Sequence, residues 1–118
     1  MSNATPSSGP DEFELISRLK AKLPTGDSVL VGAGDDCAVI DVGVPGKWQL
    51  HKTDAVVEGV HFTKDADPRQ IGHKALGRAL SDIAAMAGTP RWATVTLGLP
   101  DGFDAERVES IYDGMAAL

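Results

Sequence analysis

The 118-residue sequence has little cysteine, few basic residues and no long apolar run. Its single cysteine, Cys37, excludes an internal disulfide and a cysteine-based zinc site, and it fits a reducing, cytoplasmic setting. Eleven Lys and Arg against 17 Asp and Glu give a formal net charge of −6, which argues against non-specific binding to nucleic acid or to an anionic membrane. No stretch approaches the roughly 18 apolar residues of a membrane span, and the chain does not open with a signal-peptide pattern.

The sequence does contain enough apolar material for one modest domain, since 42% of its residues are hydrophobic. Residues 1–10 are rich in Ser, Pro and Gly, and we expect them to form a disordered lead or tag. The domain is expected to span residues 11–118. A helical pattern reaches Leu118 with no stop signal after it, which predicts that the chain is a fragment.

Hydrophobic spacing and helix-stop signals predict an α+β fold, with a mostly antiparallel sheet and helices on one face. Helices are expected at about 12–23, behind an Asp11 cap, at about 68–87, and after an Asp104 cap. A short apolar run at 29–31 precedes a glycine-rich turn, and strands are expected at about 37–42, about 48–55 and about 92–99.

Three short segments place carboxylates where these elements end. Asp35 and Asp36 follow a glycine-rich turn, and because strand neighbours point to opposite faces we expect only one of them to enter a site. Asp54 stands in a strand-like run, where aspartate is disfavoured. Asp82 lies at the edge of the apolar stripe of the long helix, where a half-buried carboxylate is costly unless it is paired. Grouped oxygen ligands of this kind suit magnesium.

Each segment also has a simpler interpretation. The two acids of the glycine-rich turn can form an ordinary acidic surface turn. Asp54 can pair with Lys52, and Asp82 can pair with Arg78 one helical turn earlier. By themselves these segments indicate a candidate magnesium site and no more.

Four segments share their wording and their order with one known family. They read GAGDDCA at 32–38, TD at 53–54 followed by VEGVHF at 57–62, GHKAL at 72–76, and LSDIAAM at 80–86. Over about residues 12–118 the chain resembles the thiamine-monophosphate kinases of the aminoimidazole-ribonucleotide-synthetase-like superfamily. The resemblance implies transfer of the γ-phosphoryl group of ATP to thiamine monophosphate, giving thiamine diphosphate. Several Mg²⁺ ions would neutralise the two anions, and no protein nucleophile would be needed.

The resemblance also implies roles for individual residues. It makes Asp36, Thr53, Asp54 and Asp82 magnesium ligands, His61 a contact to thiamine monophosphate and Tyr112 a position near ATP. It implies a homodimer paired through the N-terminal sheet. It also implies that the last strand of this domain and a C-terminal domain lie beyond Leu118, so that the fragment alone is inactive.

Lys52 departs from the family pattern, because many members carry a serine before the Thr-Asp pair. A lysine there either replaces a cation by its own charge or points away from the site. Two other functions stay open. One is a related ATP-dependent enzyme of the same fold, similar to selenophosphate synthetase or to hydrogenase-maturation proteins. The other is a catalytically incomplete fragment that dimerises or binds metal.

Overall fold

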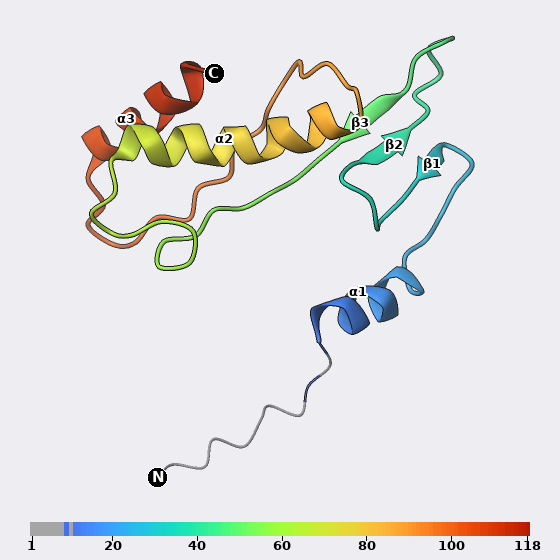
Figure 1. Ribbon diagram of the computed structural model, residues 1–118, viewed down its shortest axis with the longest axis horizontal. Coiled ribbons are helices and arrows are strands. Elements are labelled where there is room, and N and C mark those ends of the chain that lie inside the picture. The colour runs from blue at the N-terminus through green and yellow to red at the C-terminus, as the bar shows by residue number, and fades with distance from the viewer. Residues whose placement is uncertain (1–8, 10) are drawn as a thin grey trace.

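The computed structural model describes residue 9 and residues 11–118, so the expected lead at 1–10 falls outside the described residues except for Gly9. Figure 1 shows three helices and three strands along this part of the chain. In order they are α1 (Glu12–Lys20), β1 (Val29–Val31), β2 (Ala38–Ile40), β3 (Gln49–His51), α2 (Pro68–Ala85) and α3 (Ala105–Ala116). None of these helices is both long and apolar enough to cross a membrane.

The three strands form one antiparallel sheet in the order β1-β2-β3, which confirms the α+β prediction. Val39 of β2 lies opposite Leu50 of β3, and the β1–β2 register shifts between Val29 and Val31. The connection from β2 to β3 uses Gly43 at φ 79°, a left-handed conformation that a side chain would strain. β2 and β3 are shorter than the sequence predicted, because pairing stops after three residues.

Each helix begins at an aspartate whose side chain accepts a hydrogen bond from a backbone N–H of the first turn. Asp11 accepts from the N–H of Glu14 at 2.7 Å, and Asp67 and Asp104 do the same for their helices at 2.9 and 3.0 Å. These caps satisfy donors that have no partner inside the helix. The caps at Asp11 and Asp104 are those that the sequence predicted, although α1 ends at Lys20, before the expected boundary at 23.

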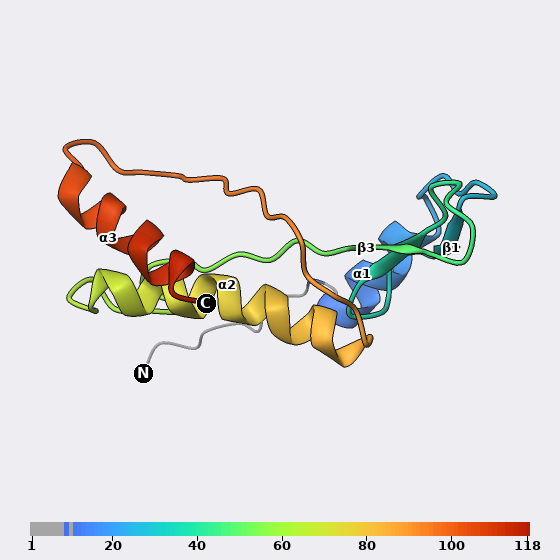
Figure 2. The same cartoon turned by 90° about the horizontal axis from the view of Figure 1, so that it is seen from above.

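The C-terminal end of α2 meets the sheet at a buried contact, which we call the joint. The backbone N–H of Cys37 lies 3.1 Å from Sδ of Met86, and its thiol lies 3.5 Å from the carbonyl oxygen of Asp82. A Cβ at Gly88 would come within 2.3 Å of Cδ1 of Leu50, so this side chain of β3 packs closely against the chain just after α2. Both views show the sheet just beyond this end of α2 (Figures 1 and 2).

α2 and α3 cross backbone against backbone near the other end of α2. A Cβ at Gly72 would lie 1.8 Å from the carbonyl oxygen of Ile111, and a Cβ at Gly114 would lie 1.9 Å from that of Arg69. Ile71 is buried beside this crossing. Two glycines therefore set the separation of the helices.

The predicted strand at about 92–99 is wrong. This segment is extended but pairs with no strand of the described residues, and Trp92, Val95, Leu97 and Leu99 are all exposed. β propensity expresses packing against a neighbouring strand, and no strand among the described residues pairs with this segment. The apolar side chains of α1 are exposed as well, since Phe13 keeps 83% of its surface accessible.

We predict that Gly72→Ala lowers the free energy of unfolding by about 3 kcal/mol, because the new methyl group collides with backbone that cannot move aside alone. Urea denaturation followed by circular dichroism measures the change. Gly77→Ala is the matched control on the same helix, since the nearest atom to its Cβ is 3.9 Å away. There we expect a gain of up to about 1 kcal/mol. Equal effects at both positions would contradict the close crossing.

We also predict that Cys37 reacts with iodoacetamide at least about tenfold more slowly in the folded chain than in urea. The residue is 2% exposed, and burial raises the pKa of its thiol, so little reactive thiolate forms. Mass spectrometry of timed samples gives the two rates. Rapid labelling without denaturant would mean that the joint is open.

Candidate functional site

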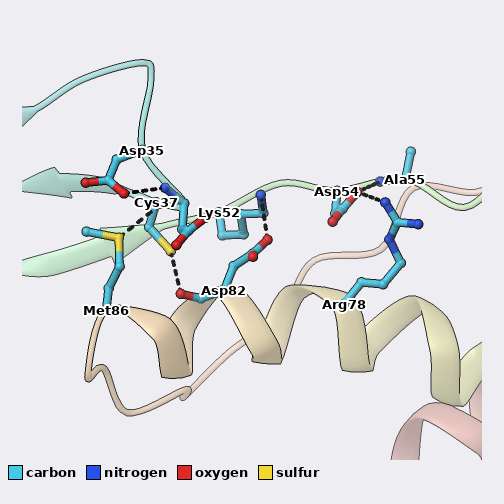
Figure 3. Close-up of polar contacts among 9 residues, drawn as sticks. Asp35, Cys37, Lys52, Asp54, Ala55, Arg78, Asp82 and Met86 are labelled. Atoms are coloured by element: carbon cyan, nitrogen blue, oxygen red, sulfur yellow. Dashed lines mark hydrogen bonds and ion pairs between the residues drawn. The ribbon is translucent and has the colours of Figure 1, made fainter.

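An open groove of about 710 Å³ runs along α2, facing the segment that follows β3. Two of its lining residues, Lys52 and Asp54, come from that segment, and the others come from α2. The α2 residues are His73, Lys74, Gly77, Arg78, Ser81 and Asp82. Figure 3 shows Lys52 and Asp54 on the extended segment above the helix, with Asp82 and Arg78 reaching towards them.

The segment after β3 runs antiparallel to α2, and this direction produces the groove. Lys52 contacts Asp82, Asp54 contacts Arg78, and the carbonyl oxygen of His61 accepts a hydrogen bond from Lys74. Residues 74, 78 and 82 are four apart and share one helix face, while residues 52 and 54 share one side of an extended chain. Successive turns of α2 therefore meet successive parts of the segment.

The ion pairs in the groove join residues of different elements, whereas the simpler interpretation of the sequence paired neighbours within one element. Lys52 does not pair with its neighbour Asp54, and Arg78 does not pair with Asp82. Nζ of Lys52 lies 2.7 Å from Oδ2 of Asp82, and Nη2 of Arg78 lies 3.4 Å from Oδ1 of Asp54. The local pairings were wrong because the antiparallel alignment offers each cation a carboxylate on the opposite element.

The Lys52–Asp82 pair is the tighter of the two, and it is partly covered. The side chains keep 22% and 26% of their surface exposed. The hydrogen bond to Asp82 raises the pKa of Lys52 above its ordinary value and outweighs the opposing effect of burial. Lys52 is therefore a charged ammonium that points into the groove, which removes the alternative in which it points away.

Asp54 is held in its ionised form. Its Oδ1 accepts the backbone N–H of Ala55 at 2.8 Å and also faces Arg78. The N–H of Ala55, with help from Arg78, lowers the pKa of this carboxyl below its ordinary value. Within the part of the chain that the structure describes, both of these contacts are made by Oδ1 of Asp54, and Oδ2 accepts no hydrogen bond.

Both helices hold the loop after Asp54 by its carbonyl oxygens. Lys74 of α2 donates to the carbonyl of His61, and Arg107 of α3 donates to those of Lys64 and Ala66 at 3.0 and 2.9 Å. Within the loop, Nδ1 of His61 accepts the N–H of Val57 at 2.9 Å. The half-buried imidazole is therefore fixed by its δ nitrogen.

The structure gathers only part of the predicted site. Asp54 and Asp82 line the groove, whereas Asp36, Thr53, His61 and Tyr112 do not. Asp36 lies at the joint, one residue before Cys37, and its N–H donates to Asp35. Tyr112 is an exposed residue of α3.

Sequence reasoning did not assign His73 or Lys74 to the site. The detectable signal was the four-residue spacing of charged side chains at 74, 78 and 82 on one helix face.

Magnesium would fit this groove only with help from a ligand. Among residues 9 and 11–118, no three His, Cys, Asp or Glu side chains are grouped closely enough to hold a metal ion. Each groove carboxylate also faces a cation already. Mg²⁺ is commonly bound by one or two carboxylates together with phosphate oxygens and water. The oxygen donors of Asp54 and Asp82 suit that mode and do not form a cage of protein ligands.

The charge of the groove contrasts with that of the whole chain. Lys52, Lys74 and Arg78 bring three cations against the two carboxylates, in a chain of net charge −6. Such a local excess of positive charge attracts an anion. The arrangement can hold a phosphate group with the cations and a phosphate-bound metal ion with the carboxylates.

Comparison with known proteins identifies the same family that the sequence motifs resemble. The family model for the N-terminal domain of AIR synthase related protein matches residues 34–118. The chain is 42% identical to thiamine-monophosphate kinase of Escherichia coli over 109 residues, which cover 91% of the chain and 33% of the relative. It is 38% identical to thiamine-monophosphate kinase of Bacillus subtilis, over 92% of the chain and 33% of that protein. The chain thus spans about a third of the length of these curated relatives. No solved structure matches it.

The contact between His61 and Val57 generates a prediction. Because Nδ1 accepts a hydrogen bond, the neutral ring must carry its proton on Nε2. Two-bond ¹⁵N–¹H correlation spectra of the labelled chain, recorded at a pH where the ring is neutral, identify the protonated nitrogen. His73, whose ring makes no hydrogen bond to the described residues, gives a reference ring in the same sample. A proton on Nδ1 of His61 would show that the loop does not form as described.

Proposed function

Since the chain belongs to the AIR synthase related protein family, through the N-terminal domain of that family, we propose that the protein carrying it is a thiamine-monophosphate kinase. It transfers a phosphoryl group from ATP to thiamine monophosphate with the help of Mg²⁺. The relatives at about 40% identity bear that name, and the proposal extends their activity to this protein.

The charged residues of the groove are the observation that best supports this proposal. Joining two phosphates requires that two anions be brought together, so charge neutralisation and positioning are the main needs. Lys52, Lys74 and Arg78 supply fixed positive charge, while Asp54 and Asp82 supply oxygen ligands on the opposite sides of the same groove. No nucleophilic side chain is needed, because the attacking atom belongs to the acceptor phosphate.

The proposed function assigns a role to each residue that the sequence motifs singled out. Asp54 and Asp82, with Thr53 next to Asp54 in the sequence and Asp36 at the joint, would hold Mg²⁺. When bound, the ion would neutralise phosphate charge and orient the transferred group. His61, whose Nε2 is left available by the contact to Val57, would face thiamine monophosphate. Tyr112 would lie near the nucleotide.

The complete reaction belongs to a longer protein in this proposal. The chain matches about a third of its relatives, so it would supply the metal and acceptor side of the site. Further segments would supply the nucleotide side, and a homodimer paired through the sheet would complete the domain.

The test is formation of thiamine diphosphate by the full-length protein that carries this chain, supplied with ATP, Mg²⁺ and thiamine monophosphate. We expect Asp54→Asn and Asp82→Asn each to lower kcat by about a hundredfold or more, because each removes a charge that positions the metal and phosphates. Chromatographic separation of the thiamine phosphates measures the product.

Asp101→Asn is the matched control, since this exposed turn residue lies outside the groove and should leave the rate unchanged. A folded full-length protein that phosphorylates another acceptor but not thiamine monophosphate would disprove the proposed substrate. Full activity in Asp54→Asn or Asp82→Asn would remove that residue from the site.

A further inference from the structure

Lys52 stands where a bound cation would stand at Asp82. Its ammonium lies 2.7 Å from Oδ2, and about three quarters of each side chain is covered. We propose that Lys52 is a built-in cation that competes with a divalent metal ion for Asp82, so that the groove takes up metal together with phosphate and binds metal alone weakly. The inference rests on the proposed function, because it assigns a regulatory part to one residue of that same groove.

The joint holds both partners of this pair in place. Lys52 follows directly after β3, which pairs with β2, and the thiol of Cys37 rests 3.5 Å from the carbonyl oxygen of Asp82. The backbone of Cys37 is held in turn against Met86. Neither backbone can withdraw without opening this buried contact.

The second ion pair of the groove is looser and provides an internal comparison. Arg78 and Asp54 are 3.4 Å apart, and the arginine side chain is 39% exposed. Asp54 also accepts a hydrogen bond from the backbone N–H of Ala55, which does not involve Arg78. Competition for a carboxylate is therefore strongest at Asp82, because the Lys52 ammonium is the one side-chain partner of this carboxylate among the described residues.

The charge of Lys52 opposes the binding of a metal ion at Asp82 unless a phosphate binds as well. A metal ion that approaches Asp82 meets the Lys52 ammonium, and two like charges a few ångströms apart repel strongly in a partly covered site. A phosphate that arrives with the metal removes the conflict, since Lys52 can turn to the phosphate oxygens while the metal takes the carboxylate. The metal and the anion then bind cooperatively, because each relieves the cost of the other.

The test uses the folded 118-residue chain and Mn²⁺ alone, with free Mn²⁺ followed by electron paramagnetic resonance. We expect Lys52→Met to tighten Mn²⁺ binding by about tenfold or more, since the competing charge is gone. Lys52→Gln is a second neutral variant in case the first folds poorly. Lys52→Arg keeps the charge and should bind like the unchanged chain. Lys47→Met, in the exposed turn before β3, is the matched control and should also leave binding unchanged.

The double variant Lys52→Met, Asp82→Asn decides where the metal binds, and we expect it to lose the gain. Unchanged Mn²⁺ affinity in both neutral variants would overturn the inference, and so would a gain that survives Asp82→Asn. These titrations contain no ATP or thiamine compound. A protein that fails the kinase assay can therefore still pass this test, and an active kinase can fail it.

Discussion

The contact between Cys37 and the last turn of α2 is the constraint on which the rest of the site depends. It fixes the sheet at one end of the helix and so determines where the chain leaves β3. From that point the only course that keeps contact with α2 runs antiparallel to it, and the two ion pairs follow from that course. With only Cys37, Val39 and Ile71 as buried apolar side chains among the described residues, little else could fix this geometry.

The charges of the groove show how an acidic chain can present an anion site. The cations sit on two elements that face one another, and each groove carboxylate is neutralised from the opposite element. Ion pairs that remain partly exposed to water contribute little to stability. Their value here lies in position, since they keep both kinds of charge aligned before a ligand arrives.

Much of the fold follows from local sequence, and the exceptions have physical causes. The caps at Asp11 and Asp104 and the strand pairing of β2 with β3 depend on neighbouring residues, so a pattern can predict them. The expected strand at about 92–99 depended on a partner that the described chain does not provide. The groove was partly predictable, since Asp54 and Asp82 were recognised as unusual for their elements. The ion pairing between different elements was not, because it depends on how the segment after β3 lies against α2.

The loop after Asp54 is tied to α2 and α3 through its main chain. Lys74 and Arg107 bind carbonyl oxygens, which every residue type possesses, and no side chain of residues 62–66 accepts from them. Sequence drift in this stretch therefore leaves its anchorage intact, whereas positions 74 and 107 have no such freedom. A protein engineer could therefore replace the side chains of residues 62–66 while the loop keeps its attachment to both helices.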